Sequence, residues 1–315
     1  LPLKRYEDVA DHAKAVYNNI IRREGGSAGM AATEYVLMNQ DIPVLDFTCR
    51  RNEFDEPEFF EGTWHVDYRP IGYRGLAAFL EHRKAPKHRE HIRQLLEQYG
   101  CDDLEGFLQV TRALSLNDTF WVKRQGEVLQ WRDVSLYTNP FSEVISEAAF
   151  DGTVSETDFS STSPEFGTDG YYAKCWIREE SGIKLYKSGS AFLEIEPLSE
   201  FLASQLAEGI CRQAVLYDLD YYHGKLISKC PLFTSETVGL AKASAVFHGA
   251  EHTIPDLLQY FRGIGSEDAF RRMCILDAII LNPDRHYGNF GVLFDTATME
   301  VLQMAPVFDN NKSLL

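Results

Sequence analysis

The sequence predicts an α+β protein, because strand-like and helical segments come in groups rather than in strict alternation. Two strand-like segments, one helical segment and two more strand-like segments follow each other between residues 171 and 233. That is the order of a small antiparallel sheet with one packed helix. Two helical segments, a polar loop and another strand pair then occupy residues 254–309. A chain of 315 residues has room for two domains, or for one domain in two lobes.

Residues 1–29 form the first predicted segment. Residues 6–24 carry apolar side chains at helical spacing, which predicts an amphipathic helix with a stripe of Val9, Ala13, Val16, Ile20 and Ile21. The stretch "GGSAG" that follows has the composition of a flexible linker, and Met30 after it fits a second start of the chain. The segment is therefore either appended or a native arm. An isolated helix of about 19 residues is marginal in water, so we expect it to dock on a protein surface.

Residues 30–150 form an unassigned α+β region. Its strand-like pieces are "EYVLM", "IPVLDF", "TWHVDYRPI" and "DTFWV", and its helical stretches lie near residues 74–84 and 86–99. Basic residues and histidines gather between His82 and Arg93. Such a run is able to bind an anion or a metal, but we interpret it as the solvated face of a helix. The region contains no motif that predicts a chemistry.

The next unit, residues 151–235, is predicted to begin with a loop, because residues 151–170 are rich in Ser, Thr, Asp and Gly and lack apolar periodicity. Its strands are "YYAKCWI" with "IKLYKS" and "AVLYDLDYY" with "KLISKCPLF", and its helix is "PLSEFLASQLAEGI". The last unit, residues 236–315, contains the helical segments "IPDLLQYFRGI" and "SEDAFRRMCILDAII". Ser266 is the expected N-cap of the second helix, and Pro283 follows its end.

A polar loop follows that buried helix, in "LNPDRHYGNFGVLFD" at residues 281–295. Asp284 and Asn289 lie five residues apart in it, and Asp309 follows at a predicted strand end in "APVFDNN". Phosphoryl transfer from ATP needs a carboxylate that orients the attacking hydroxyl and accepts its proton, and oxygen ligands that hold Mg²⁺ over the phosphates. In this interpretation Asp284 is the base, while Asn289 and Asp309 are the metal ligands. Taken singly, Asp284, Asn289 and the neighbouring His286 also fit plain caps of a helix end and a turn.

The preceding unit supplies a candidate phosphate-binding lysine. Lys187 lies at the end of the second strand, within reach of the α and β phosphates, and Glu200 on the following helix is the carboxylate that would fix its ammonium. Lys174 on the first strand is a second candidate. Gly167 and Gly170 precede that strand, where a turn that covers phosphates would lie.

Other polar side chains are expected to support the loop. Asp277 lies seven residues before Asp284 on the apolar side of the helix. A buried carboxylate needs donors, and Arg285 or backbone N–H groups of the loop are suitable ones. We therefore interpret Asp277, Arg285 and His286 as scaffold for the loop.

The two loops resemble those of the HipA-like Ser/Thr protein kinases, whose pattern is D-x-H-x-x-N-[FHW] followed by A-P-x-[FY]-D. The stretches "NPDRHYGNFGVLFD" and "MAPVFDN" carry the likeness. It extends through "GYYAKCWI", "LYKSGS", "SEFLASQLAEGI" and "ISKCPLF", and so covers roughly residues 165–315.

The resemblance implies a two-lobed protein-kinase-like fold, ATP and Mg²⁺ as cofactors, and a protein substrate with a Ser or Thr acceptor. It gives the same roles to Asp284, Asn289, Asp309 and Lys187, and it places the hinge beside adenine at Lys229 to Phe233, with Pro231 between them. Members often act as toxins beside a DNA-binding antitoxin partner. Members also silence themselves by phosphorylating a serine in the glycine loop. The loop here offers hydroxyls without a clear match, at Ser161, Thr162, Ser163 and Thr168.

The sequence departs from the family in two places. Residues 31–150 do not show the usual small N-terminal module. The chain also ends six residues after Asp309, where the family usually continues into a helical region. The large lobe is therefore expected to be incomplete.

Two other functions fit parts of the sequence. The D-R-H-x-x-N run with a later Asp also resembles the catalytic loop of phosphoinositide kinases, although no basic or amphipathic membrane-facing segment stands near it. Alternatively, the fold survives as a binding module without catalysis. Measurements of liposome binding and of ATP binding would separate these functions.

The composition limits partners and location. The balance of 31 Lys+Arg against 47 Asp+Glu gives a net charge of −16, which disfavours direct binding to a nucleic-acid backbone. The six cysteines include no C-x-x-C pair, so neither a zinc site nor a disulfide framework is predicted. No apolar run reaches the roughly 18 to 20 residues that span a bilayer. We expect a cytoplasmic protein that binds neither nucleic acid nor membrane directly.

Overall fold

The structure is a computed structural model that describes residues 32–83, 103–141, 173–190, 195–247 and 252–314. The chain divides into two units, Leu1–Ala32 and Thr33–Leu315, and every element below belongs to the second. Some sequence predictions concern residues outside the described ranges. They are the helix at 6–24 with its linker, most of the basic run after Arg83, the helical stretch at 86–99, and the loop at 151–170 with Gly167, Gly170 and its four hydroxyls.

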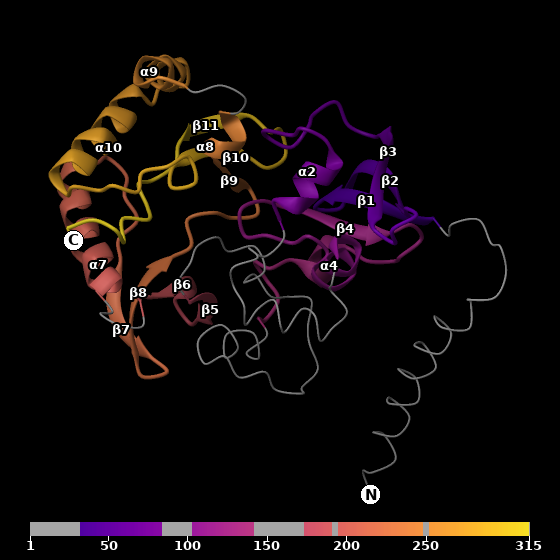
Figure 1. Cartoon of the computed structure of the whole chain (residues 1–315), viewed down its shortest axis with the longest axis horizontal. Coiled ribbons are helices and arrows are strands. Elements are labelled where there is room, and N and C mark those ends of the chain that lie inside the picture. The colour runs from indigo at the N-terminus through magenta and orange to yellow at the C-terminus, as the bar shows by residue number, and fades with distance from the viewer. Residues whose placement is uncertain (1–31, 84–102, 142–172, 191–194, 248–251, 315) are drawn as a thin grey trace, which may run out of the picture. The chain divides into compact units, whose positions relative to one another are not determined.

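The N-terminal region forms an antiparallel sheet with the strand order β3-β2-β1-β4 (Figure 1). Its strands are β1 Thr33–Asn39, β2 Ile42–Arg51, β3 Pro57–Trp64 and β4 Phe120–Arg124, and its helices are α2 Leu76–Glu81, α4 Leu104–Thr111 and α5 Trp131–Val134. Three of the four predicted strands are confirmed. The prediction of a strand over residues 63–71 is wrong, because the third strand ends at Trp64.

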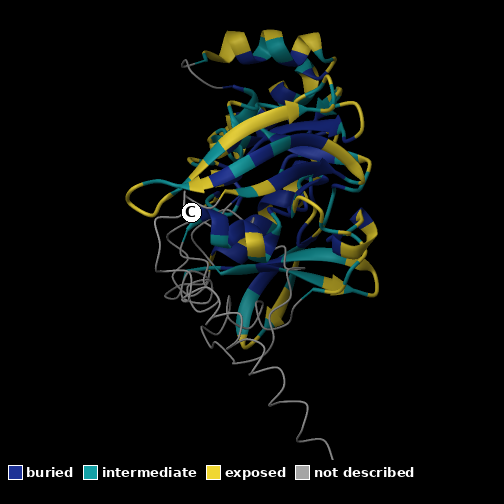
Figure 2. Ribbon diagram, turned by 90° about the vertical axis from the view of Figure 1, so that its right-hand side faces the viewer, coloured by how far each residue is buried: buried dark blue, intermediate teal, exposed yellow. Residues whose placement is uncertain are grey.

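The third strand escaped the sequence pattern because it is an edge strand with few buried side chains. In Figure 2 the outer strand is largely exposed and the inner strands are buried, which agrees with the burial of β3 and β1. The inner strands supply the aromatic core, in which Tyr35 and Phe47 stack with 5.3 Å between ring centroids. An edge strand carries no clean alternation of apolar residues, so periodicity does not find it.

The second sheet has the strand order β5-β6-β8-β7 and is antiparallel throughout. Its strands are β5 Lys174–Glu179, β6 Gly182–Ser188, β7 Asp218–Tyr222 and β8 Lys225–Pro231, with α7 Ile195–Ile210 between β6 and β7 in the chain. The predicted order of strand, strand, helix, strand, strand is confirmed. The tight β5–β6 connection uses Gly182 at φ 125°, a backbone conformation that side chains other than hydrogen disfavour.

The third sheet, in the order β11-β10-β9, carries the polar loop. Its strands are β9 Val238–Lys242, β10 Gly291–Asp295 and β11 Val301–Met304, and its helices are α8 Ala243–Val246, α9 Ile254–Gly263 and α10 Glu267–Ile279. Phe261 of α9 and Phe270 of α10 stack at 4.8 Å in the core. Ser266 precedes α10 as predicted, but its hydroxyl accepts from the backbone N–H of Met304 at 3.0 Å instead of capping the helix.

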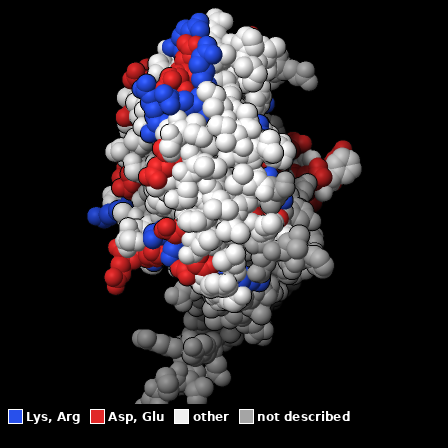
Figure 3. All heavy atoms as spheres, turned by 90° about the vertical axis from the view of Figure 1, so that its left-hand side faces the viewer, with Lys and Arg blue, Asp and Glu red and all other residues white. Residues whose placement is uncertain are grey.

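Figure 3 shows the face that carries α7 and α10. Charges of both signs gather at its upper end over α9 and the start of α10, where Glu267 pairs with Arg262 and Arg271. The middle of the face is largely free of charged side chains. Apolar side chains are exposed on α7 and α10, at Leu198, Leu202, Leu206, Ile275 and Ile279. None of the helices in the described residues is long and apolar enough to cross a bilayer.

Candidate active site

The centre of the site is an ion cluster around Lys187. The Nζ atom of Lys187, on β6, lies 2.8 Å from Oε1 of Glu200 on α7 and 2.7 Å from Oδ1 of Asp309. Glu200 is fully buried, and its other oxygen accepts from the hydroxyl of Ser228 on β8 at 3.1 Å. The cluster therefore joins β6, α7 and the segment after β11 at a single ammonium group, and Glu200 connects it to β8.

Helix α7 reaches the cluster with its polar face. The buried positions of this helix are occupied by small or polar residues, namely Glu196, Pro197, Ser199, Glu200, Ala203, Ser204 and Ala207. The small side chains allow the helix to approach the sheet closely, and the carboxylate of Glu200 then meets Lys187 without water between them.

The charges of the cluster stabilise one another. Burial acts to lower the pKa of Lys187, but Asp309 and Glu200 outweigh burial and raise it above its ordinary value. Burial raises the pKa of Glu200, and the charge of Lys187 offsets this only in part. Burial likewise acts to raise the pKa of Asp309, but the charges of Lys187 and then Lys174 bring it well below its usual range. Lys187 is therefore a firmly charged group and Asp309 a firmly ionised one at neutral pH.

Asp309 is positioned by a short irregular segment after β11. Val307 exchanges backbone hydrogen bonds with the segment before β7: its carbonyl accepts from Val215 at 2.9 Å and its N–H donates to Gln213 at 3.1 Å. Asp309 itself has φ 59°, in the left-handed region. A non-glycine residue there is uncommon and costs energy, although Asp tolerates it better than most. The turn directs its carboxylate toward Lys187 instead of along the strand.

Asp284 and Asn289 are held together by the loop between α10 and β10. The side-chain amide of Asn289 donates to the carbonyl of Asp284 at 2.9 Å, and the N–H of Asp284 donates to the side chain of Asn282 at 3.0 Å. The ring of His286 accepts from the N–H of Gly288 at 2.9 Å. A Cβ at position 288 would lie only 2.6 Å from that ring, so any residue larger than glycine would push the ring out of this position.

Arg285 ties this loop to the segment that carries Asp309. Its guanidinium pairs with Asp277 of α10 at 3.0 Å, and it donates to the carbonyls of Asn289 at 2.6 Å and Phe308 at 2.8 Å. It also bonds the side chain of Asn310. The residues on both sides of Asp309 and the carbonyl of Asn289 are therefore fixed by one side chain. The structure places Arg285 and Asp277 as support for both loops.

The side chains above border two hollows. A cavity of about 260 Å³ is bounded by most of the residues predicted to bind ATP and metal, namely Lys174, Lys187, Pro231, Phe233, Asn289 and Asp309. His286, which was predicted as scaffold, borders it too. An adjoining hollow of about 110 Å³ brings Asp284 together with Lys174, Lys187, Asn289 and Asp309. Apolar side chains cover another part of the larger cavity, at Trp176, Leu185, Leu232, Leu240 and Phe308.

The structure does not bring Lys229 to this cavity. Lys229 lies between Ser228 and Cys230 on β8, and side chains alternate between the faces of a strand. Its ammonium therefore points to the other face, where it pairs with Asp220 at 2.6 Å. Cys230 faces the cavity instead, where burial raises the pKa of its thiol to about 12.

Two groups of cavity residues were not predicted. Ser115, Leu116 and Asn117 come from the N-terminal region, and Lys242 comes from the end of β9. The loop at 115–117 reaches the cavity through backbone contacts, since the Asn117 carbonyl accepts from the N–H of Leu240 at 2.7 Å and the Leu116 carbonyl accepts from the Thr234 hydroxyl. These contacts join distant parts of the chain and leave no local pattern in the sequence.

The oxygen donors of the site fit magnesium better than a softer metal. No group of three or more His, Cys, Asp and Glu side chains that could hold a metal occurs within the described residues. Asp309 and Asn289 border both hollows, and each offers a hard oxygen. Mg²⁺ binds through one or two carboxylates together with waters and phosphates, so this sparse donor set is compatible with it.

No protein-family model and no curated protein matches the sequence. Among solved structures, the chain is similar to HipA of the Shewanella oneidensis MR-1 toxin–antitoxin system, solved with HipB and operator DNA. The TM-score is 0.53 and the identity 11%, over 88% of this chain and 75% of that one. The chain has a HipA-like kinase fold. The α+β class and the two-lobed kinase-like architecture predicted from the sequence are thereby confirmed.

A second similar structure is the proinflammatory kinase CtkA of Helicobacter pylori, with a TM-score of 0.39 and 20% identity. The match covers 45% of this chain, which spans about half of that kinase, 55% of its length.

Proposed function

We propose that this protein is a protein kinase that transfers the γ-phosphoryl group of ATP to a Ser or Thr hydroxyl in the presence of Mg²⁺. The observation that carries the proposal is the buried Lys187 ammonium, which contacts Glu200 and Asp309 at the border of a cavity that also contains Asn289. A lysine fixed by a helix carboxylate beside an oxygen ligand for metal is the arrangement that phosphoryl transfer requires.

The cavity offers a place for each part of the nucleotide. The apolar side chains of Leu185, Phe233 and Phe308 suit a base, and Lys187 and Lys174 suit the phosphates. Asn289 and Asp309 would hold Mg²⁺, which when bound neutralises charge on the phosphates.

Asp284 acts on the acceptor. Its carboxylate orients the Ser or Thr hydroxyl and accepts its proton. The acceptor oxygen bonds to the γ-phosphorus while the bond from that phosphorus to the β–γ bridging oxygen breaks, and ADP leaves. The position of Asp284 in the small hollow with Lys187 and Asp309 supports this assignment.

The biological setting that we propose is a toxin–antitoxin pair in the cytoplasm. The HipA structure similar to this chain was solved with HipB and operator DNA. A net charge of −16 disfavours DNA contact by this chain itself, so DNA binding would be the task of an antitoxin-type partner. The cysteines among the described residues are all free thiols, as expected in a reducing compartment. Growth arrest on expression that disappears in Asp284→Asn would support the toxin role.

The decisive experiment compares wild type with Asp284→Asn in ATP binding and phosphoryl transfer. Calorimetry should give nearly equal ATP affinities for the variant and the wild type, both with Mg²⁺ and without it. Transfer to a protein acceptor should fall about 10²- to 10⁴-fold in the variant. The exposed Asp67→Asn serves as the matched control and should behave as wild type. Wild-type transfer by Asp284→Asn would show that Asp284 is not the base.

Vesicles that contain phosphatidylinositol provide a second acceptor in the same assay. Phosphorylation of the lipid in place of protein would favour the phosphoinositide-kinase alternative. ATP binding without any transfer would favour a binding module.

A further inference from the structure

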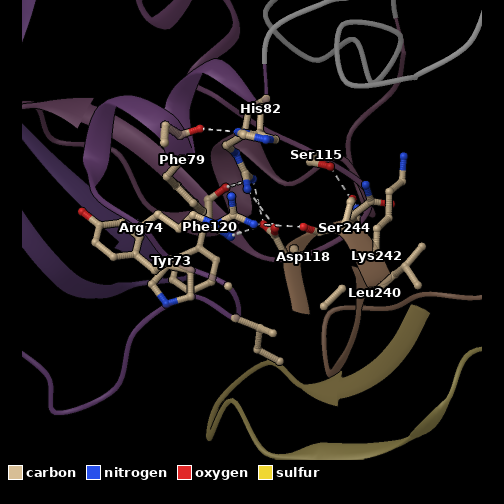
Figure 4. A pocket seen from close by; sticks show the side chains of 18 of the residues that line it. Tyr73, Arg74, Phe79, His82, Ser115, Asp118, Phe120, Leu240, Lys242 and Ser244 are labelled. Carbon is tan, nitrogen blue, oxygen red and sulfur yellow. Dashed lines mark hydrogen bonds and ion pairs between the residues drawn. The ribbon is translucent and has the colours of Figure 1, made fainter. Parts of the chain in front are cut away.

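A second cavity is larger than the cavity of about 260 Å³, which we call the nucleotide cavity, and it shares residues of β9 with that cavity. Its volume is about 370 Å³. Figure 4 shows it between α2 with the preceding loop, the loop that carries Asp118, and β9 with the start of α8. We call it the second cavity. Its border includes Tyr73, Arg74, Phe79 and His82 on one side and Lys242 and Ser244 on the other.

The second cavity adjoins the nucleotide cavity. Ser115, Asn117, Leu240 and Lys242 border both. Lys242 borders the nucleotide cavity together with Asp309. The two cavities therefore share part of their walls, and the nucleotide cavity is bordered by Asn289 and Asp309 as well.

The β9–α8 side of the second cavity is also bonded to the catalytic loop. The N–H of Ser244 donates to the carbonyl of Tyr287, and the N–H of Ala243 donates to that of Phe290, both at 2.8 Å. A molecule that contacts this wall therefore contacts a segment that is hydrogen-bonded directly to the loop that carries Asp284 and Asn289. Arg74 reaches across the cavity and donates to the carbonyl of Ser244 at 3.2 Å.

The charges at the border favour an acidic ligand. Arg83 and Asp118 form a buried bidentate pair, with both N–O distances at 2.8 Å, and so neutralise each other. The border also carries the basic side chains of Arg74, His82 and Lys242 and the carboxylate of Glu81. A border that is basic in a chain of net charge −16 selects for negative charge locally.

The floor of the second cavity is apolar. Aromatic rings and aliphatic side chains form it, at Ile71, Phe79, Phe120, Leu240 and Phe294. Such a floor accommodates one large apolar side chain, while the basic rim binds carboxylates beside it.

We propose that the second cavity binds the protein substrate, by an acidic segment whose apolar side chain enters the cavity and whose carboxylates meet Arg74 and Lys242, so that the neighbouring Ser or Thr is presented to the catalytic loop. This inference rests on the proposed kinase function. It adds the chemical class of the acceptor sequence and the part of the molecule that recognises it. The N-terminal region, through Arg74, Phe79 and His82, is then the substrate-selecting part.

The test uses a short fluorescent peptide in which one serine is flanked by phenylalanine and glutamates, and a matched peptide with lysines in place of the glutamates. Fluorescence anisotropy measures binding to the full chain with Mg²⁺ and a non-hydrolysable ATP analogue. Arg74→Glu reverses an exposed rim charge without touching the nucleotide cavity. It should weaken binding of the acidic peptide about tenfold or more, and the affinity for the ATP analogue should not change.

Two further variants make the result specific. Arg132→Glu changes a surface arginine whose side chain is 80% exposed and which does not border the cavity, so it should bind the acidic peptide like wild type. Ala78→Leu narrows the cavity from α2 and should also weaken peptide binding, without a change in nucleotide affinity.

Equal affinity of Arg74→Glu and wild type for the acidic peptide would overturn the inference, as would stronger binding of the lysine peptide or no binding of either peptide. These outcomes leave the kinase proposal intact when the wild type still binds ATP with Mg²⁺ and hydrolyses it. If the wild type does not bind ATP at all, the kinase proposal itself is refuted.

Discussion

Replacement of Lys187 by Met tests the ion cluster most directly. The substitution keeps the volume of the side chain and removes the ammonium that faces Glu200 and Asp309. Glu200 has no exposed surface, and Ser228 alone then donates to it. Removing one partner of a buried ion pair costs about 3 to 5 kcal/mol, because the other charge stays buried without compensation. We expect a loss of this size in the free energy of unfolding at neutral pH.

The loss should shrink in mild acid. In the wild type, the lowered pKa of Asp309 gives stability that is present above the ordinary value of 3.8 and disappears as the pH falls toward its folded value. The raised pKa of Lys187 gives stability that is present below 10.5 and disappears only in more alkaline solution. Both groups therefore make their full contribution to the stability of the wild type between pH 5.5 and 7.5, a window of about two pH units.

The variant behaves differently in that window, because burial already raises the pKa of Glu200 and the lysine no longer opposes it. As the pH falls, proton uptake by Glu200 then reduces the destabilisation of the variant by up to about 1.4 kcal/mol per pH unit. Urea denaturation of both proteins at pH 7.5 and 5.5 measures the difference. A destabilisation below about 1 kcal/mol, or one that is equal at the two pH values, would refute the reasoning.

The same sheet offers a matched control for Lys187→Met. Lys229 is also paired with a carboxylate, at 2.6 Å from Asp220, but that carboxylate is about half exposed, with 49% of its side-chain surface accessible. Lys229→Met should cost less than about 1 kcal/mol, as surface ion pairs do. It should also leave ATP binding unchanged, because its side chain lies on the face of β8 away from the cavity.

The remaining predictions concern the metal and the support of the loops. Asp309→Ala should abolish the dependence of ATP affinity on Mg²⁺, and equal affinities for variant and wild type across a Mg²⁺ titration would exclude Asp309 as a ligand. Arg285→Lys should lower the free energy of unfolding by about 2 to 4 kcal/mol in urea, because an ammonium cannot replace a fork that serves Asp277, two carbonyls and Asn310 at once. A loss under about 1 kcal/mol would show that these bonds do not hold the loops together.

The local part of the site could be predicted from the sequence because its information is local. Asp284, His286 and Asn289 lie within one short loop, and their spacing alone suggests a common role. Lys187, Glu200 and Asp309 are distant in the sequence. Lys187 lies near the end of β6 and Glu200 on α7, whereas Asp309 lies in an irregular segment after β11 and not at the predicted strand end. Their order along the chain resembles the order of the corresponding residues in HipA-like kinases, and the structure brings all three together. Their chemical roles stay predictions, as do the domain boundaries near residues 150 and 235.

The direction of side chains was harder to predict. Lys229 belongs to the predicted hinge beside adenine, and the alternation along β8 points its side chain away from the cavity. Only tertiary pairing fixes which face of that strand is inner. Helix α7 makes a similar point. Its leucines at 198, 202 and 206 are partly exposed, and its small and polar residues are buried against the sheet. Hydrophobic periodicity predicts the helix but would assign its buried face incorrectly.

The N-terminal region contributes to the site through tertiary contacts with the segment between β8 and β9. Glu236, on the segment between β8 and β9, accepts from the indole N–H of Trp131 at 2.6 Å and from the Ser135 hydroxyl at 2.9 Å. Its backbone carbonyl accepts from the side chain of Gln40 at 2.7 Å. That segment joins the second sheet to the third, and the loop at 115–117 borders the nucleotide cavity beside it.

The sequence resemblance to the HipA-like kinases covers roughly residues 165–315, whereas the similarity to the HipA structure extends over 88% of the chain. The sequence resemblance therefore leaves out Ser115 and Asn117, which belong to the wall that the two cavities share. Asn117 belongs to that wall and bonds β9 directly. A fragment that begins near residue 165 would retain Lys187, Asp284, Asn289 and Asp309 yet lose one side of the nucleotide cavity and most of the second cavity. The kinase-like half and the N-terminal region are thus separable as patterns in the sequence, but they form a single site in the folded chain.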